Sequence, residues 1–410
     1  MTSPRPVVAA FLAFRFCRSL YFHIAILVPF FLSKGLDLSD VFLLESVYFF
    51  AKVLFDVPSG LIADRLNKRL CIASSGFLAS GGYCLVATGS SFEIFLLAQI
   101  ILGISVALFS GADTTAMLDQ IQRSDRQHLY SRVESWGGAL RHLGFGTAAI
   151  IGGFVAVYWA PSITWGLSSI AMFTAGCIGL TFPQNPPGKT EAGQLGNKAL
   201  IVATLQYLHH DKFVFGVMVL FAGIYSLVRL GLYFMQPIVG QLGVDLSANG
   251  LLFAGAIALS IFTSIKCARL FPISHLRRAV LILALFGGIY PAAWAVAVSA
   301  NTPLLAWAMF AVGYVIYGVL QGLFEPLQRI WIAQRIPSAF RTTLLSSGSV
   351  AANLLFSIVG PIAGYGAETL GLPVILYLIS GFYLLVLLMS GFLVMRESDK
   401  GLLAPGSPRP

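Results

Sequence analysis

The sequence predicts an all-α membrane protein, with twelve transmembrane helices in two six-helix bundles related by a pseudo-two-fold axis. Charged residues are 10% of the 410 residues and apolar residues are 57%, which is too little charge to cover a soluble chain of this length. Apolar stretches of about 20 residues recur from end to end, long enough for membrane helices and too long for barrel strands. An internal repeat divides these stretches into two halves.

The loop charges predict the orientation of the spans. Cations gather in loops after even-numbered spans, among them Arg277 and Arg278, whereas the opposite loops hold Lys34 and little else. The positive-inside rule therefore places both termini in the cytoplasm. Because the net charge of +9 comes mostly from these loops, it does not indicate a nucleic-acid partner. The predicted spans are 7–33, 41–64, 70–89, 93–119, 133–158, 161–182, 213–239, 247–268, 279–299, 303–328, 343–367 and 372–395.

The internal repeat predicts two domains. Proline, glycine, aspartate, leucine and serine recur at an offset of 208 between residues 29–39 and residues 237–247. An even number of spans in each half gives both halves the same orientation, so the repeats are parallel, about an axis normal to the membrane. We expect an N-terminal bundle at 1–182, a cytoplasmic linker at 183–212, a C-terminal bundle at 213–398 and a cytoplasmic tail at 399–410.

A tight hairpin between spans two and three carries the most specific motif. Residues 60–69 read Gly-Leu-Ile-Ala-Asp-Arg-Leu-Asn-Lys-Arg, which resembles the loop signature of the major facilitator superfamily. The preceding Asp-Val-Pro-Ser-Gly, residues 56–60, resembles the form in bacterial efflux and small-molecule transporters of that family. Residues 148–153 read Ala-Ala-Ile-Ile-Gly-Gly where the family's antiporters carry Gly-Pro-x-x-Gly-Gly. That departure weakens an assignment as an antiporter.

The resemblance implies a secondary active transporter that works by alternating access, without a cofactor or metal. We expect proton-coupled export of a small amphipathic or anionic organic molecule by a monomer in the bacterial inner membrane. The alternatives are proton-coupled uptake of an organic anion and a scaffold or sensor that no longer transports. The sequence shows no nucleophile–base constellation, phosphate-binding loop or metal cluster, so we do not expect an enzyme.

The hairpin is expected to act as a cytoplasmic gate. A carboxylate at a helix end can accept hydrogen bonds from the free N–H groups that begin another helix. The family resemblance places the start of span eleven, near Thr342 and Thr343, beside the aspartate of the motif. The alternative is a structural turn with lipid-facing cations. The predicted gating residues are Gly60, Asp64, Arg65, Lys68 and Arg69.

Arginines within the spans predict an anion-binding pocket. An ionisable side chain at membrane depth is costly, so it should face a cavity or a partner. Spans one and seven line the central cavity in the family that this chain resembles, and guanidinium groups there suit an anionic substrate. Arg15 could instead reach the cytoplasmic face. The predicted substrate-binding residues are Arg15, Arg18, Tyr21, Tyr225, Arg229, Tyr233, Gln236, Gln321 and Asn353.

Several ionisable residues within the spans have an alternative explanation as ion pairs. The pairs considered are Lys52 with Asp56, Asp113 with Arg141, and Lys266 with Glu325. If protons drive the carrier, a carboxyl or imidazole group in a dry cavity could load and release them. The candidates for proton coupling are Glu45, Asp56, Asp113, His142 and Glu325, and the sequence does not choose among them.

Overall fold

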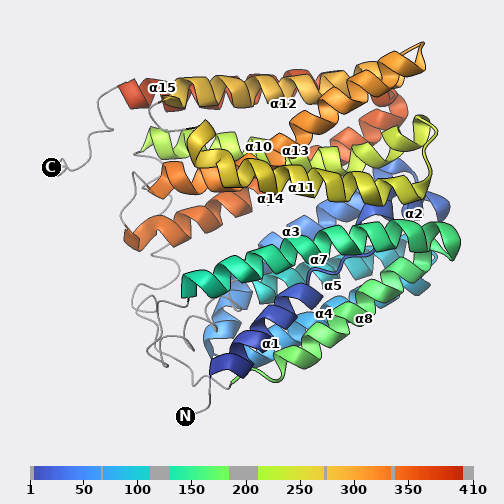
Figure 1. Ribbon diagram of the computed structural model, residues 1–410, viewed down its shortest axis with the longest axis vertical. Helices are drawn as coiled ribbons and strands as arrows, with labels where there is room; N and C mark the ends of the chain where they lie inside the picture. Colours follow the sequence, from blue (N-terminus) through green and yellow to red (C-terminus); the bar gives the residue numbers. More distant parts are fainter. Residues whose placement is uncertain are drawn as a thin grey trace. The chain divides into compact units, whose positions relative to one another are not determined.

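The computed structural model describes residues 4–65, 68–110, 130–183, 211–271, 275–333 and 338–399. Every regular element in these ranges is a helix (Figure 1). Ten of the described helices, from Arg69 onward, are long and apolar enough to cross a membrane. The first two predicted spans precede these ten, and the first contains two shorter apolar helices, Val8–Cys17 and Ile24–Ser33. The elements are α1 (Pro4–Cys17), η1 (Ile24–Ile26), α2 (Leu27–Ser33), α3 (Leu38–Arg65), α4 (Lys68–Thr88), α5 (Phe92–Phe109), α7 (Tyr130–Tyr158), α8 (Pro161–Gly179), α10 (Lys212–Gln241), α11 (Leu246–Leu270), α12 (Leu276–Ser299), α13 (Pro303–Ala333), α14 (Ser338–Thr369) and α15 (Leu372–Asp399).

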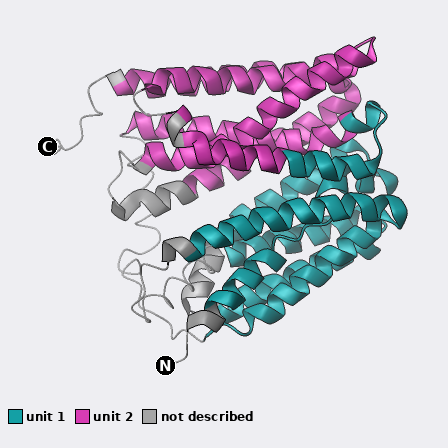
Figure 2. Ribbon diagram, viewed as in Figure 1, with its two compact units in different colours: residues 1–189, 239–255 teal, residues 190–238, 256–410 magenta. Residues whose placement is uncertain are grey.

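The helices pack as two compact units (Figure 2). Unit 1 comprises residues 1–189 and 239–255, and unit 2 comprises residues 190–238 and 256–410. In unit 1, α4 packs against α5 and α8, and α1 packs against α7 and α8. In unit 2, α12 packs against α13 and α15. The start of α11 belongs to unit 1, where a Cβ atom on Gly250 would lie 2.4 Å from the carbonyl oxygen of Ala149 on α7.

The repeat is visible in two loops of matching geometry. Gly35 and Gly243, which are 208 residues apart, both adopt a positive φ, of 83° and 77°. After each glycine the backbone N–H of the next residue reaches back to the preceding helix, Leu36 to Phe31 and Val244 to Val239, at 3.3 Å in both cases. This is the six-to-one bond of a Schellman cap, which requires the left-handed conformation at glycine. The two matching sequences therefore end their helices in the same way.

The first predicted span is not a continuous helix. The sequence predicts one apolar helix over residues 7–33, but residues 18–23 are not helical and separate α1 from η1 and α2. The prediction of a continuous helix was wrong. The length of an apolar stretch indicates whether it can span the membrane, but it does not show where neighbouring helices supply hydrogen-bond partners for a non-helical backbone.

The hairpin of the sequence motif has the predicted form. Helix α3 ends at Arg65 and α4 begins at Lys68, so the connection is as short as the sequence predicts. The side chains of residues 57–68, which include Asp64, Arg65 and Lys68, lie outside the described part of the structure. Arg69 is described and is half-buried at the start of α4.

Candidate functional site

The break in the first span is stabilised by two neighbouring helices. The backbone N–H of Phe22 donates to the Ser168 hydroxyl on α8 at 3.0 Å. On the other side, a Cβ atom on Gly152 of α7 would lie 1.7 Å from the carbonyl oxygen of Phe22. Only glycine leaves room for that approach. Since irregular backbone at membrane depth must be satisfied by protein, Ser168 and Gly152 are what allow the break to exist.

Arg18 lies at the start of this break and is 5% exposed. Its Nη2 donates to the Ser105 hydroxyl at 3.1 Å, and its Nη1 contacts the sulfur of Met172 at 2.9 Å and the Tyr21 hydroxyl at 3.4 Å. The guanidinium carbon lies 5.3 Å from the centre of the Phe109 ring. Its Nε is buried without a hydrogen-bond partner. Among the described residues no carboxylate lies within ion-pair distance of Arg18.

Arg15, one turn earlier on α1, has a different environment. Its Nη1 forms an ion pair with Glu134 on α7 at 2.9 Å, and its guanidinium also lies over the Phe11 ring. The sequence prediction left Arg15 between the pocket and the cytoplasmic face, and it did not consider Glu134. An acidic residue at the start of span five, at the same membrane side as Arg15, was the signal that could have identified this pair.

An aromatic cluster surrounds the break. The imidazole of His23 stacks on Trp165 with ring centres 3.9 Å apart, and Tyr83 lies 4.7 Å from His23. Tyr21 contacts Tyr83 edge-on at 6.1 Å and stacks on Phe145 at 5.1 Å. Within this cluster the sequence prediction gave a binding role only to Tyr21, because the tyrosine, tryptophan and phenylalanine around it are aromatic residues among many in apolar spans. Together they give Arg18 an aromatic setting.

Ser168 also determines how His23 is held. The Ser168 hydroxyl donates its proton to the carbonyl oxygen of Thr164 at 2.9 Å. With that proton used, it can only accept from Nδ1 of His23, which lies 2.9 Å away. A neutral His23 therefore carries its proton on Nδ1. The buried ring is thus fixed by one hydrogen bond and by its stack on Trp165.

Glu45 is a buried carboxyl group held by an amide. Glu45 on α3 is 5% exposed and Gln99 on α5 is 2% exposed. The Nε2 of Gln99 donates to Oε1 of Glu45 at 2.8 Å. A lone glutamine within the apolar span four was a signal for this contact, because a polar group at membrane depth is expected to find a partner.

The other candidate proton residues have varied environments. Asp56 pairs with Lys52 at 2.9 Å, which confirms the predicted pair. Glu325 pairs with Arg329 on the same helix, so the predicted pair with Lys266 was wrong. An i, i+4 partner needs no contact with another helix, and the Lys266 ammonium lies over the Phe262 ring at 4.1 Å. Asp113, and with it the predicted pair with Arg141, lies outside the described residues; His142 is half-buried.

Three of the six predicted binding residues of unit 2 are buried, and the other three are half-buried. Arg229 lies over the ring of Tyr225, 5.2 Å from its centre, one turn apart on α10. Tyr233, Gln236 and Asn353 are each no more than 2% exposed. Tyr233 contacts the ring of Phe356 at 5.7 Å, and Gln236 bonds to its own helix at the carbonyl oxygen of Leu232.

Two amide oxygens of unit 2 are notable. The side-chain carbonyl oxygens of Gln321 on α13 and Asn353 on α14 are buried and accept no hydrogen bond from the described residues. The amide nitrogen of Asn353 contacts the Ser349 hydroxyl at 3.4 Å. Buried acceptors of this kind are uncommon, because an unsatisfied polar group is costly. They are available to a ligand that carries hydrogen-bond donors.

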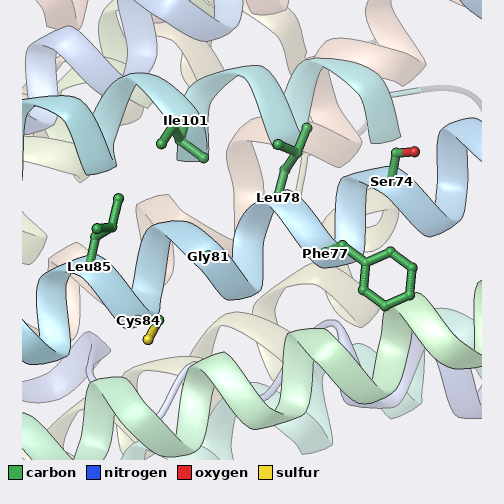
Figure 3. A pocket seen from close by; sticks show the side chains of 7 residues that line it. All are labelled: Ser74, Phe77, Leu78, Gly81, Cys84, Leu85 and Ile101. Atoms are coloured by element: carbon green, nitrogen blue, oxygen red, sulfur yellow. The ribbon is translucent and has the colours of Figure 1, made fainter.

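A shallow groove on α4 is of a different character. It is lined by Ser74, Phe77, Leu78, Gly81, Cys84, Leu85 and Ile101. Figure 3 shows Leu78 and Leu85 pointing from α4 toward α5, which carries Ile101. Phe77 points toward α8, where its ring lies 5.4 Å from that of Phe173. The groove holds no charged group, and its apolar lining suits the acyl chains around a membrane span.

Comparison with known proteins places this chain among transporters. A family model described as Major Facilitator Superfamily matches residues 7–314. The uncharacterized MFS-type transporter YxaM of Bacillus subtilis (strain 168) is 37% identical over 86 residues, which are 21% of this chain and only 22% of that protein's length.

Solved structures share the fold at low sequence identity. The nucleoside transporter NupG has a TM-score of 0.76 and 14% identity, covering 96% of this chain and 98% of its own. The D-xylose-proton symporter has a TM-score of 0.70 and 15% identity, covering 97% of this chain and 97% of its own. The peptide transporter POT in complex with sulfate has a TM-score of 0.72 and 15% identity, covering 98% and 95%. At these low sequence identities the similarity shows the fold alone. That shared fold confirms the predicted twelve-helix class.

Proposed function

Because the chain belongs to the Major Facilitator Superfamily, we propose that it is a proton-coupled secondary active transporter of a small amphipathic organic anion. It works by alternating access as a multi-pass membrane protein. The family and the related folds indicate a transporter rather than an enzyme, with a small molecule as its substrate. The proposal includes a monomer in the bacterial inner membrane with both termini in the cytoplasm, as the loop charges indicate.

The environment of Arg18 is the observation that supports an anionic substrate. Its neighbour Arg15 is neutralised by Glu134, whereas Arg18 has no carboxylate within ion-pair distance among the described residues. A buried guanidinium is strongly disfavoured unless an anion compensates it. The aromatic rings of Tyr21 and Tyr83 nearby suit a ligand with an apolar or ring-bearing body. A substrate that combines a carboxylate, sulfonate or phosphate with such a body fits this setting.

The second half supplies further binding groups in this proposal. Arg229 with Tyr225 provides a cation beside an aromatic ring, and Gln321 and Asn353 provide buried acceptor oxygens. Tyr233 and Gln236 support the helix that carries Arg229. The bundles at 1–182 and 213–398 would alternate around the substrate, and the hairpin with Gly60, Asp64, Arg65, Lys68 and Arg69 would close the cytoplasmic side.

The direction of coupling follows from the charge of the site. In antiport the proton and the substrate bind the carrier in alternation. A cationic substrate suits this scheme, because a cation and a proton compete for the same carboxylate. An anion beside a fixed cation instead binds better when a nearby carboxyl group is protonated. The carboxyl of Glu45 lies in the same unit as Arg18. We therefore favour proton symport of an organic anion over the export by antiport that the sequence first suggested.

Transport in proteoliposomes tests the proposed function. The purified full-length protein is reconstituted, a pH gradient is imposed, and uptake of a panel of aromatic carboxylates and sulfonates is measured beside neutral analogues. We expect gradient-dependent uptake of anions. Arg18→Ala should reduce anion uptake about tenfold to a hundredfold, since hydrogen bonds to a charged group contribute roughly 1.5–3 kcal/mol.

Two controls make this result specific. Arg18→Lys keeps the charge but loses the planar fork, so it should retain part of the uptake. Asp64→Asn should slow transport and leave binding largely intact, because the hairpin is proposed to act on conformation. Equal loss of neutral and anionic substrates in Arg18→Ala would contradict the anion site, and selective loss of binding in Asp64→Asn would contradict the gate.

A further inference from the structure

We infer that the Met172 side chain occupies the place of the substrate's anionic group at Arg18, and that the substrate binds by displacing it. This inference rests on the proposed function, since it names the residue that controls access to the proposed anion site. Met172 lies on α8 and is fully buried. It covers the guanidinium group of Arg18 until an anion replaces its sulfur.

The sulfur of Met172 lies where an oxygen of an anion is expected. Nη1 of Arg18 contacts this sulfur at 2.9 Å. A guanidinium group donates to carboxylate oxygens at a separation of about 2.7–2.9 Å. A thioether sulfur is a weak and neutral acceptor, so it does not compensate the charge of Arg18. An anion in the same position gains a charge-assisted hydrogen bond that the sulfur does not provide.

A separate contact fixes the other end of the guanidinium group. The Ser105 hydroxyl donates to the carbonyl oxygen of Ser75 on α4 at 2.7 Å, so it is oriented to accept from Nη2 of Arg18 at 3.1 Å. Both serines are fully buried. The Phe109 ring lies beside the same guanidinium group. Arg18 therefore keeps its position when Met172 moves away.

The backbone at Met172 is fixed, so only its side chain can move. A Cβ atom on Gly76 of α4 would lie 2.9 Å from the carbonyl oxygen of Met172 and 2.5 Å from the backbone nitrogen of Gly176. The backbones of α4 and α8 are therefore in direct contact around this turn. Methionine is unbranched and has three rotatable side-chain bonds, so its thioether can leave Arg18 without a shift of the helix.

The remaining donors of Arg18 are a second observation that points to a ligand. Its Nε is buried and has no hydrogen-bond partner among the described residues. Ser105, Met172 and Tyr21 contact only Nη1 and Nη2. An anion with several acceptor oxygens can bind more than one N–H of a guanidinium group. The protein itself thus uses only part of the hydrogen-bonding capacity of Arg18.

The displacement makes Met172 a residue that determines selectivity. For an anion, the new contact with Arg18 offsets the loss of packing around the thioether. A neutral ligand of the same shape gains no such contact. The apparent affinity for an anion is lower than its intrinsic affinity, because the thioether is away from Arg18 for only a fraction of the time. Removing the thioether should therefore raise the affinity for anions.

Binding of naphthalenesulfonate to the purified full-length protein tests this inference. In Met172→Ala nothing has to be displaced, so we expect the affinity to rise about tenfold, as for a binding-competent state that is populated at about 10%. Met172→Glu places a tethered carboxylate beside Arg18 and should abolish binding. Met172→Gln, the neutral counterpart of similar shape, should still bind. Met218→Ala changes a buried methionine of unit 2 and should leave the affinity unchanged.

A measurement on the wild-type side chain does not depend on the folding of a loss-of-binding variant. In protein with isotope-labelled methionine methyl groups, the NMR signals of Met172 and Met218 are identified by their loss in Met172→Leu and Met218→Leu. We expect naphthalenesulfonate to shift the Met172 signal, because the side chain changes its conformation, and to leave the Met218 signal in place. A Met172 signal that stays unchanged while naphthalenesulfonate binds would overturn the inference.

The proposed function and this inference fail in different ways. If Arg18→Ala binds naphthalenesulfonate as tightly as the wild type, the anion site of the proposed function is wrong. If Arg18→Ala loses binding but Met172→Ala binds no more tightly than the wild type, the anion site stands and the role of Met172 is overturned. Size-exclusion profiles of each variant confirm that it is folded before it is compared.

Discussion

The first and seventh spans occupy equivalent positions in the repeat but have different backbones. The first is interrupted at residues 18–23, whereas α10 is helical through the equivalent residues 226–231. Both carry a proline at the same repeat position, Pro29 and Pro237. Pro29 lies in the first turn of α2, where its missing N–H is tolerated, and Pro237 lies inside α10. Proline therefore does not explain why only one of the two spans is broken.

The surroundings of the two segments explain the difference. The break in the first span has Ser168 to accept from its backbone and Gly152 to give it room. In α10 the side chain of Ser226 instead hydrogen-bonds with the Tyr383 hydroxyl at 2.7 Å. The Tyr290 hydroxyl donates to the carbonyl oxygen of Leu227. The break of the first span thus carries Arg18 and His23, whereas the equivalent stretch of α10 carries Arg229 and is contacted by the hydroxyl groups of Tyr290 and Tyr383.

The largest expected effect comes from removing the space beside the break. In Gly152→Ala the new methyl group meets the carbonyl oxygen of Phe22, so α7 and the first span must separate. We expect a loss of roughly 1–3 kcal/mol in the free energy of unfolding, as for an overpacked core. The measurement is thermal unfolding of the purified protein in detergent, with transport in proteoliposomes as a second readout.

Gly146→Ala is the matched control on the same helix. A Cβ atom there has no atom within 4 Å, and alanine favours a helix over glycine by roughly 1 kcal/mol. This variant should be as stable as the wild type or more so. Equal stability of both variants would show that the close approach of Gly152 to the break does not matter.

Removing the hydroxyl of Ser168 should have the next largest effect. In Ser168→Ala the partly buried N–H of Phe22 loses its acceptor, which costs roughly 1–2 kcal/mol, and His23 loses its contact as well. Hydrogen exchange should rise across residues 18–24 and remain low in α10. Thr174→Ala on the same helix alters an exposed hydroxyl that bonds to Ile170, so it should leave exchange at the break unchanged. Unaltered exchange in Ser168→Ala would mean that the break does not depend on α8.

The smallest effect is expected in the seventh span. Ser226→Ala removes one hydrogen bond between side chains and leaves the helical backbone intact, so it should cost about 0.5–1.5 kcal/mol. Tyr383→Phe removes the same bond from the other side and should have a similar effect. Both are measured by thermal unfolding. Hydrogen exchange that opens along α10 in either variant would indicate that this helix, like the first span, depends on side-chain support.

The sequence predicted some contacts of the site and missed others for physical reasons. Lys52 and Asp56 could be paired from their spacing alone, since residues four apart share a helix face. Arg18 was predicted as a binding residue because a cation at membrane depth needs an explanation. Ser105 and Met172, which contact it, could not be predicted, because serine and methionine are ordinary in a membrane helix. Glu325 was assigned a partner on another helix when a nearer one lay on its own.

The sequence by itself determined the class of this protein: hydropathy defined the spans, the offset of 208 defined the repeat, and the hairpin motif indicated the family. Those features depend on segment length and on local pattern, which a linear chain records. Only the tertiary structure decided that the first span breaks and that the seventh does not. A helix in a membrane satisfies its own backbone, so a break depends on the donors, acceptors and space that other helices bring to it. Ser168 and Gly152 lie more than a hundred residues from Phe22, and no local pattern connects them.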